Sequence, residues 1–519
     1  MLAATLFTTP KLISMKFKKL FLKQISTLFI LTILATYSTA QNESLSLTKE
    51  QALQDLHWLR FSLEYVHPRL YKYDDKKTVD ARFDILEKAI SNRISGLDFL
   101  ALITRFNATV RCGHLYTIPQ DELSKEVLDK MVLPFYIKLA EGKFYLFNDC
   151  SGLSIPDGSQ ILSINDKSDS DILIAMLPGI AADGYIETRK MQLLQRYIFP
   201  AFQGFDLYYY LFVDRSNTFK IDYITFGTNQ KKTIIVKGIS SEERKKILLN
   251  RYNIDEEIWF KTPSPKFEFD TNRNFAVLTI SRSFYNKQID PPFDSLLSFA
   301  FKTIEDKKTD NLILDMRNNE GGDESQQITL MSYLYDKPFK LYQNIYLSHL
   351  DFRPLKPVIV ERDTSTLLFN NDDEYMRKIN DNLWINNYDY SDNLQLKEPD
   401  MNVFKGKLYV LMNGACFSSA ADLISDLKKT TDAVFIGEES GGTFEGPTGG
   451  DDIVIQLPNS KIMVRISPNI QIGYMYQKYP IGRGVLPTYP IHYTIEDLVQ
   501  HKDLEMEFAK KLIQNSQNK

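Results

Sequence analysis

Cysteine is scarce in this chain, whose 519 residues include only three: Cys112, Cys150 and Cys416. Three cysteines are too few for a disulfide framework, and an odd number leaves at least one unpaired within a monomer. No Cys-x-x-Cys pair occurs, and no two histidines stand at the spacing of zinc ligands. The sequence therefore predicts a fold without a metal, stabilised by burial of apolar side chains.

A basic surface stripe is also missing. The formal net charge is −4, and Lys and Arg are scattered along the chain outside the N-terminus. This composition gives no reason to expect nucleic-acid binding. Internal repeats and low-complexity tracts are absent as well. With 43% hydrophobic and 25% charged residues the chain is typical of globular proteins, and its length predicts two or three domains.

Long apolar runs are missing except near the N-terminus, where Leu28–Ala35 is short for a membrane span. Lys16, Lys18, Lys19 and Lys23 precede this run, and Ser38-Thr-Ala40 follows it with small residues at the positions that a signal peptidase reads. We therefore expect residues 1–40 to be a signal peptide cleaved after Ala40, with an uncleaved anchor as the alternative. The predicted protein is exported, with no membrane span after cleavage, and is periplasmic, cell-surface or secreted.

The first two segments after the signal peptide differ in periodicity. Residues 41–130 are predicted as an N-terminal helical domain, because apolar residues recur at helical spacing from Leu53 to Val66 and in two later stretches. Residues 131–239 contain short alternating strands, including a Pro/Gly turn and strand within 155–165. The charged stretch 240–266 is predicted as a linker or connecting helix.

Strands and helices alternate in residues 267–519. Apolar strand patterns at 275–280, 311–316 and 408–412 are each followed by a helical pattern. This order predicts an α/β domain with a parallel or mixed sheet. Residues 350–402, rich in Asn, Asp and Tyr, are predicted as an insertion over the sheet edge. Trp384, Tyr388 and Tyr390 there either contact substrate or hold the loop in place.

One strand-to-helix turn contains adjacent serines, within Asn413-Gly-Ala-Cys-Phe-Ser-Ser-Ala-Ala-Asp422. The N–H groups of a first helical turn have no partner within the helix and can bind an oxyanion. Serine nucleophiles of acyl-transfer enzymes use this geometry. The alternative is that Ser418 and Ser419 only cap the helix.

A glycine turn, Arg317-Asn-Asn-Glu-Gly-Gly-Asp323, follows an earlier strand of the same domain. Paired glycines let the backbone approach a ligand and present its N–H groups, although they also form simple tight turns. Two such turns can meet at one carboxyl edge of a sheet. Ser419 would then be a nucleophile facing an oxyanion hole, formed by the N–H groups of Gly321, Gly322 and Ala420.

The motifs resemble those of the C-terminal processing (tail-specific) serine peptidase family. Residues 311–322 are similar to its strand and Arg-Asn-x-x-Gly-Gly turn, and Ser419-Ala-Ala-Asp422 is similar to its Ser-Ala-x-Glu nucleophile motif. Residues 434–442, 484–487 and 155–165 resemble a later glycine turn, a closing motif and the core of a PDZ domain. The resemblance implies ClpP/crotonase-like superhelical βα units, a PDZ-like domain at 131–239 and no cofactor.

Two departures from the family pattern concern the general base and its partner. Tail-specific members use a lysine, but residues 438–446 contain none. The tricorn-like branch uses a histidine, and the segment around His114 resembles its pattern, so the resemblance implies that His114 is the base. A neutral imidazole suits that role. The orienting acid stays open between a dyad without one and four candidates: Glu438, Glu439, Glu445 and Asp451.

The expected activity is that of an exported serine endopeptidase acting on peptides or proteins. The PDZ-like domain would bind an extended peptide, including the C-terminus of a substrate, by strand addition. One alternative is a catalytically silent peptide-binding protein on the same scaffold. The other is an esterase or amidase acting on a non-peptide acyl substrate.

Overall fold

The computed structural model describes residues 44–199, 202–255, 261–271, 275–360, 376–387 and 391–517. The predicted signal peptide and two tyrosines of the insertion, Tyr388 and Tyr390, lie outside these ranges. None of the helices described is both long and apolar enough to cross a membrane. All three cysteines are buried.

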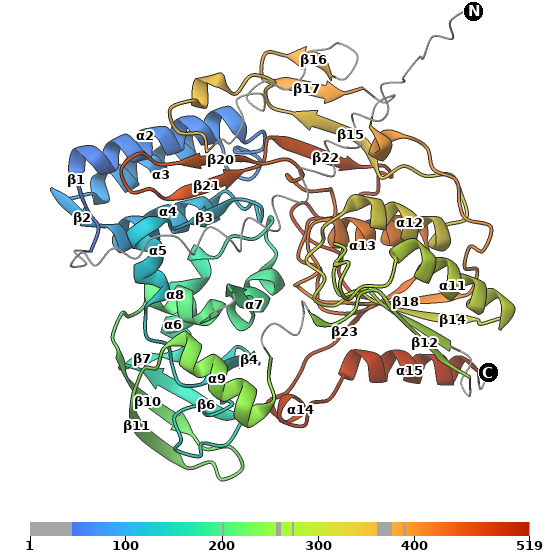
Figure 1. Cartoon of the computed structure of the whole chain (residues 1–519), viewed down its shortest axis with the longest axis horizontal. Helices are drawn as coiled ribbons and strands as arrows, with labels where there is room; N and C mark the ends of the chain where they lie inside the picture. Colours follow the sequence, from blue (N-terminus) through green and yellow to red (C-terminus); the bar gives the residue numbers. More distant parts are fainter. Residues whose placement is uncertain are drawn as a thin grey trace, which may run out of the picture. The chain divides into compact units, whose positions relative to one another are not determined.

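Six strands form the central sheet, in the order β12-β13-β14-β18-β19-β23 (Figure 1). Their bounds are Lys266–Asp270 for β12, Phe275–Thr279 for β13, Asn311–Asp315 for β14, Lys407–Met412 for β18, Val434–Gly437 for β19 and Tyr489–Pro490 for β23. β12 runs antiparallel to β13, and the other neighbouring pairs are parallel. The predicted α/β fold with a mixed sheet is therefore confirmed.

Helices cover both faces of this sheet. The helices α11 (Phe293–Asp306), α12 (Glu324–Leu334) and α13 (Ser419–Thr430) pack on one face, and α15 (Leu504–Gln517) packs on the other (Figure 1). Alternate side chains of β13 point to opposite faces of the sheet. Ala276 and Leu278 pack with α11–α13, whereas Phe275 and Val277 pack with α15. Burial on both sides explains why this strand is an unbroken apolar run.

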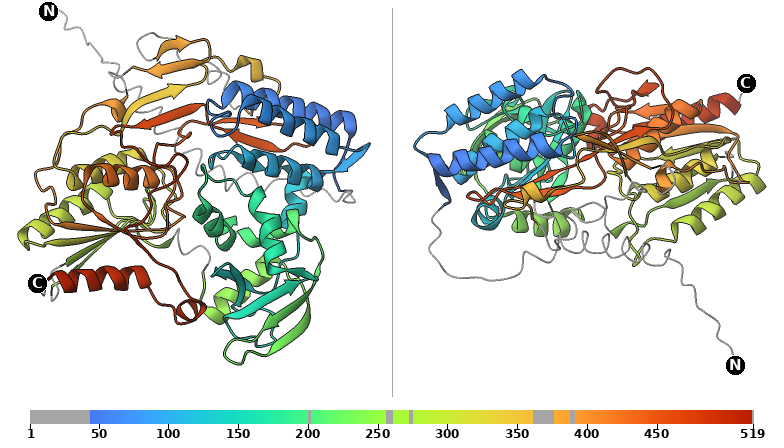
Figure 2. Two further views of the ribbon diagram at one scale, coloured as in Figure 1. Left: turned by 180° about the vertical axis from the view of Figure 1, so that it is seen from behind. Right: turned by 90° about the horizontal axis from the view of Figure 1, so that it is seen from above.

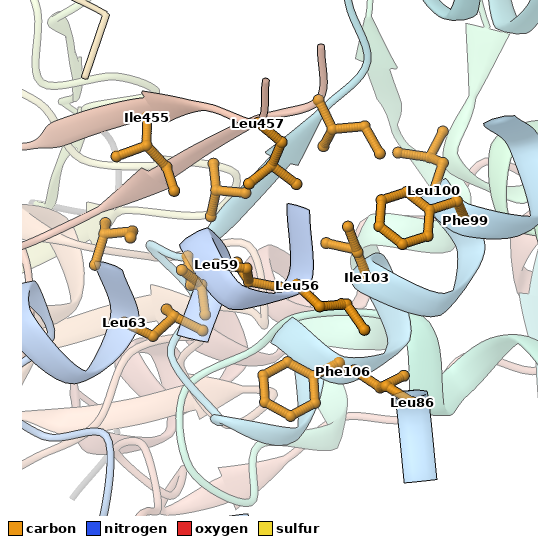
Figure 3. Packing of buried hydrophobic residues seen from close by; sticks show 14 of the residues in the cluster. Leu56, Leu59, Leu63, Leu86, Phe99, Leu100, Ile103, Phe106, Ile455 and Leu457 are labelled. Carbon is orange, nitrogen blue, oxygen red and sulfur yellow. The ribbon is translucent and has the colours of Figure 1, made fainter. Parts of the chain in front are cut away.

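The N-terminal helices pack against strands from the far end of the sequence. α2 (Lys49–Val66), α3 (Lys76–Ala89) and α4 (Gly96–Thr109) share one apolar core with β20 (Ile453–Gln456) and β21 (Met463–Ile466). Figure 3 shows Leu56 and Leu59 of α2 beside Ile455 and Leu457, and Figure 2 shows the same neighbourhood from two other directions. The short strand β3 (Tyr116–Ile118) pairs with β21, so the segment after His114 is fixed to residues 463–465.

Residues 131–239 contain an antiparallel sheet in the order β11-β10-β6-β5-β4. Its strands are β4 (Tyr136–Ala140), β5 (Lys143–Phe147), β6 (Ser159–Ile164), β10 (Thr218–Ile224) and β11 (Lys231–Lys237), and β7 (Lys167–Ser168) pairs with β6. Between them lie α6 (Asp169–Met176), the 3-10 turn η1 (Leu177–Gly179), α7 (Glu187–Gln195) and α8 (Gly204–Phe212). The stretch predicted as a linker or connecting helix contains α9 (Ser241–Tyr252).

Strands of the predicted insertion extend a second sheet. β16 (Met376–Asn380) and β17 (Leu383–Asn386) continue the pair β15 (Tyr342–Leu347) and β22 (Asn469–Gly473). Trp384 packs on a small apolar cluster with Leu347, Leu350 and Met376, which favours the interpretation that it holds the hairpin in place. The remaining short elements are β1 (Ser46–Thr48), β2 (Arg93–Ser95), α5 (Asp121–Leu128), β8 (Tyr197–Phe199), β9 (Phe202–Gln203), η2 (Arg353–Leu355), η4 (Asp392–Leu394) and α14 (Ile495–Val499).

Candidate active site

The serine turn joins β18 to α13 and contains one strained residue. Ser418, immediately before the helix, has φ 53° and ψ −133°, a combination that residues with a side chain rarely adopt. The turn is held by the side chain of Asn413, whose Oδ1 accepts hydrogen bonds from the N–H groups of Ala415 at 3.2 Å and Asn318 at 3.1 Å. Ser418 is only partly buried, so its hydroxyl stands at a sharp turn with access to solvent.

The glycine turn meets the serine turn at the carboxyl edge of the sheet, as the sequence predicts. Gly321 has φ 87°, and a Cβ on it would lie 2.8 Å from both Ser418 Cβ and Ser419 N. Only glycine permits this approach. The turn is shaped by Asn319, whose Oδ1 accepts from Gly321 N–H at 2.9 Å while its Nδ2 donates to the carbonyl of Ile280 at 3.0 Å.

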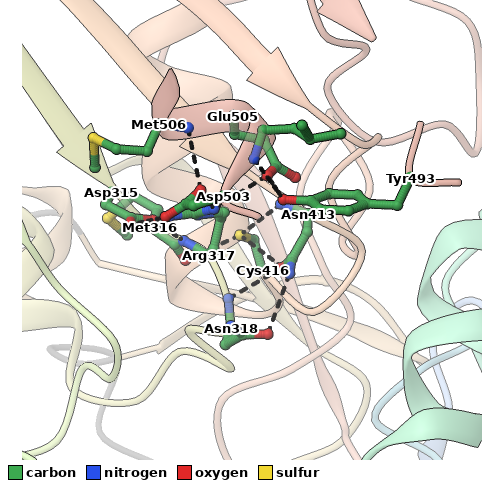
Figure 4. A network of polar contacts seen from close by, with 11 residues as sticks. Asp315, Met316, Arg317, Asn318, Asn413, Cys416, Tyr493, Asp503, Glu505 and Met506 are labelled. Carbon is green, nitrogen blue, oxygen red and sulfur yellow. Dashed lines mark hydrogen bonds and ion pairs between the residues drawn. The ribbon is translucent and has the colours of Figure 1, made fainter. Parts of the chain in front are cut away.

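A polar network beneath the two turns fixes them to each other and to the C-terminal helix (Figure 4). Arg317 donates to Asp315 at 2.7 Å and to Asp503 at 2.6 Å. The amide of Asn413 also donates to Asn318 Oδ1 at 3.2 Å. Because most of these groups are partly buried and charge-assisted, they constrain the site more firmly than exposed ion pairs do.

The imidazole of His114 reaches the serine turn from the N-terminal third of the sequence. Its Nε2 lies 3.1 Å from the Oγ of Ser418, and its side chain is buried, with 6% of the residue exposed. The ring stacks on Phe417 with 4.5 Å between centroids. The Arg189 guanidinium lies 4.3 Å from the same phenyl ring, and Gly449 leaves room for the imidazole, because a Cβ there would be 3.1 Å from its Cε1.

Burial and positive charge keep His114 neutral. Burial lowers the pKa of His114 to about 3, with smaller contributions from Arg465 and Arg189 in the same direction. The imidazole is therefore unprotonated at neutral pH, and one of its nitrogens carries a lone pair. With Nε2 beside a serine hydroxyl, this group can accept that hydroxyl's proton.

The structure places the predicted site residues together but with different partners. His114 contacts Ser418, whereas the predicted nucleophile Ser419 is buried and its Oγ accepts from Gly322 N–H at 2.9 Å. The other two predicted oxyanion donors are engaged: Gly321 N–H with Asn319, and Ala420 N–H with the carbonyl of Phe417 at 3.2 Å. The difference goes with the backbone, because Ser418, the residue before the helix, has a positive φ, whereas Ser419 begins the helix.

The four predicted orienting acids each bind another group. Glu439 pairs with Arg483 at 2.6 Å, and Glu445 pairs with Lys72 at 2.8 Å. Glu438 accepts from the Gln192 amide at 2.8 Å, and Asp451 accepts from the Asn469 amide at 3.1 Å. Among the residues that the structure describes, none of these four carboxylates hydrogen-bonds to His114.

A carboxylate that the sequence analysis missed lies closer to the imidazole. Asp183 stands between η1 and α7 with 4% of its surface exposed, and its Oδ1 accepts from Gly113 N–H at 2.6 Å. One ligand atom each of Cys112, His114 and Asp183 lie within 4.8 Å of one another, a grouping that could hold a metal ion. Burial raises the pKa of the Cys112 thiol to about 12, so it is protonated here. The only local signal is an Asp-Gly turn, which is too common to single out.

Comparisons with known proteins agree with this architecture. Residues 275–463 match the family model described as Peptidase family S41. The structure of mature CPAF complexed with lactacystin is similar to this one with a TM-score of 0.61 and 15% identity, covering 91% of this chain and 99% of that one. A second structure of mature CPAF has a TM-score of 0.58 and 16% identity over 90% and 96% of the two chains. No curated protein matches the sequence. At these identities the structural likeness shows a shared fold.

Proposed function

We propose that this protein is a serine endopeptidase in which Ser418 is the nucleophile and His114 is the general base, since residues 275–463 match the model of peptidase family S41. The observation that carries this assignment is the 3.1 Å contact between His114 Nε2 and Ser418 Oγ. The strained backbone of Ser418 supports it, because a nucleophilic serine at a strand-to-helix turn needs an exposed hydroxyl. Ser419 occupies the position of the family's motif serine, but the imidazole of His114 contacts Ser418 instead.

The reaction follows from the neutral state of His114. Its Nε2 takes the hydroxyl proton as Ser418 Oγ attacks the carbonyl carbon of the scissile peptide. The imidazolium then protonates the departing amine, which leaves an acyl group on Ser418. The imidazole next removes a proton from water, and the hydroxide attacks the acyl carbon. The bond to Ser418 Oγ then breaks, the second product leaves, and the imidazolium returns the proton to Oγ.

Two backbone amides flank Ser418 and are suited to bind the oxyanion. The N–H of Ser419 lies in the first turn of α13, where helix geometry provides no acceptor. The N–H of Gly322 points at the Ser419 hydroxyl in the resting structure. A carbonyl oxygen entering the site would displace that hydroxyl from Gly322 and gain two donors. Gly321 and Ala420 then shape the turns rather than bind substrate.

Fluorophosphonate labelling tests the nucleophile. We expect wild type to react, Ser419→Ala to keep most of that reactivity, and His114→Ala to lose much of it. Ser418→Ala should lose about 10⁴-fold or more, since removing a nucleophile has effects of that size. Labelling that survives Ser418→Ala and disappears in Ser419→Ala would return the nucleophile to Ser419. A folded wild-type protein that never labels would instead favour the silent binding protein.

The location and the mode of substrate capture are proposed on sequence grounds. Residues 1–40 support export, and Edman sequencing of the mature protein should then begin at Gln41. Residues 131–239 support peptide capture by strand addition. In that sheet the edge strand β4 already uses the N–H groups of Ile137 and Leu139 to bind glutamine side chains, which favours the opposite edge, β11, as the docking strand.

A further inference from the structure

Two buried polar atoms beside the proposed nucleophile have no hydrogen-bond partner within the described structure. They are Nδ1 of His114 and Oδ2 of Asp183. A ring nitrogen of His114 and a carboxylate oxygen of Asp183 lie within 4.8 Å of each other. Since Nε2 is directed at Ser418, Nδ1 is the nitrogen left to interact with the carboxylate. Unsatisfied buried groups carry an energetic cost, so two of them on neighbouring side chains call for an explanation.

We infer that Asp183 is the positioning carboxylate of His114, accepting a hydrogen bond from Nδ1–H so that the Nε2 lone pair faces Ser418. This inference rests on the proposed function and supplies the third member of its catalytic group. It replaces the four acids favoured by the sequence, whose oxygens are bound elsewhere. A small rotation of either side chain, or one bridging water, brings the two atoms into hydrogen-bond contact.

The backbone around Asp183 is fixed to the same segment that carries His114. Gly113 N–H binds Oδ1, and the N–H of Gly184 donates to the carbonyl of Arg111 at 3.0 Å. The next residue, Tyr185, donates its N–H to Gly482 at 2.7 Å. These bonds hold the carboxylate and the imidazole in one small unit, while a small cavity lined by Asp183 and Cys112 leaves space for the rotation.

The electrostatics of the site show why a carboxylate is needed. Burial and the charges of Arg465 and Arg189 disfavour a protonated His114, yet the transition state requires an imidazolium. An anion at Nδ1 offsets this penalty when the proton arrives. Burial raises the pKa of Asp183, and the bond from Gly113 and the charges of Lys72 and Arg189 offset only part of this rise.

Steady-state peptide hydrolysis by the full-length protein tests the assignment with Asp183→Asn, Asp183→Glu and the matched control Asp451→Asn. Asparagine keeps the bond to Gly113 but favours the wrong imidazole tautomer, so we expect kcat to fall about 10³- to 10⁴-fold with little change in KM. The acid limb of the pH–rate profile should move to lower pH. Asp183→Glu should recover part of kcat, and Asp451→Asn should behave as wild type.

A kcat within about threefold of wild type in Asp183→Asn, with an unchanged pH profile, would overturn the inference. Failure of the proposed function is distinct, because Ser418→Ala and His114→Ala would then remain active too. Should Asp183→Asn not fold, ¹⁵N shifts of the His114 ring in wild type decide the matter. A proton on Nδ1 in a strong hydrogen bond supports the inference, and a proton on Nε2 contradicts it.

Discussion

At the scale of single residues, the site depends on how closely two turns approach. Ser418 and Ser419 are neighbours in sequence, but only Ser418 has a positive φ, and the backbone of Gly321 lies directly against both. The absence of a side chain at Gly321 is therefore what lets the serine turn and the glycine turn share one edge. A methyl group there would separate the hydroxyl of Ser418 from the donors proposed for the oxyanion.

Gly321→Ala should inactivate the protein and destabilise it. The new Cβ would stand 2.6 Å from the carbonyl oxygen of Phe417 and 2.8 Å from Ser419 N, at a φ of 87°. Gly142→Ala is the matched control, because Gly142 has φ 74° but no neighbour within 4 Å. The control should lose about 1–2 kcal/mol from backbone strain alone and keep its labelling. Equal effects of the two substitutions, measured by urea unfolding and fluorophosphonate labelling, would contradict the packing argument.

The two buried histidines predict an acid-sensitive fold. Burial lowers the pKa of His67 to about 4 and that of His114 to about 3. Below about pH 6.5 these two histidines bind protons in the unfolded protein but stay neutral in the folded one. Stability therefore falls as the pH drops from about 6.5 towards 4. Each unit by which the pH falls in this window lowers the free energy of unfolding by about 1.4 kcal/mol per histidine.

His67→Gln isolates one part of this effect. Between about pH 7.5 and pH 5 the variant should lose about 2 kcal/mol less unfolding free energy than wild type. His492→Gln is the control, since that histidine lies outside the buried core. An acid dependence that is the same in all three proteins would show that His67 is not buried in its neutral form.

Local patterns predicted some site residues and missed others for a physical reason. The Gly-Gly and Ser-Ser turns are encoded by neighbouring residues, and the β/α alternation brings them to one edge. The proposed choice of Ser418 over Ser419 depends on the backbone of a turn that lies against Gly321, about a hundred residues earlier in the sequence. Asp183 and the two residues after it are held by hydrogen bonds to two distant segments, around Gly113 and at Gly482, so no spacing in the sequence points to Asp183.

At the scale of elements, α9 is tied to α8 by a buried ion pair. The guanidinium of Arg244 and the carboxylate of Asp206 are almost fully buried, and Arg244 also donates to the carbonyl of Leu133 at 3.1 Å. This helix falls in the stretch whose charged composition predicted a linker or connecting helix. The charged residues of α9 therefore have two roles. Arg244 holds the helix against α8, whereas Glu242 and Lys246 pair with each other in solvent.

Asp206→Asn should destabilise the protein by about 3–5 kcal/mol, since it leaves a buried guanidinium without its counter-charge. The control is Glu242→Gln on the same helix, which breaks an exposed pair with Lys246 at 3.0 Å and should cost under about 1 kcal/mol. Chemical denaturation of both variants measures the difference. Similar losses would mean that the Arg244–Asp206 pair is solvated in solution.

At the scale of the molecule, the N-terminal helices and the C-terminal strands are interdependent. Asp55 of α2 accepts from the N–H groups of Asn459 at 2.9 Å and Ser460 at 2.7 Å. Arg69 donates to the carbonyl of Gly446 at 2.8 Å. Together with the β3–β21 pairing, these contacts show that β20 and β21 are packed against the N-terminal part of the sequence, so one apolar core of residues 267–519 is completed by residues 47–132.

A fragment of residues 267–519 should therefore be unstable and unlabelled, because it lacks His114 and exposes the apolar faces of β20 and β21. Adding residues 41–266 as a separate polypeptide should restore labelling if the two pieces associate. Circular dichroism and fluorophosphonate labelling of the fragment, with and without its complement, provide the measurement. A stable fragment that labels alone would contradict this interdependence.

The pairing of β3 with β21 also sets the timing of activity during biosynthesis. A nascent polypeptide presents its histidine early, but the strand that aligns it emerges from the ribosome more than three hundred residues later. Such long-range contacts form late in folding. Under the proposed function, nearly the whole polypeptide must be made before His114 and Ser418 can act together, so a cell that synthesises the protein is not exposed to its activity until then.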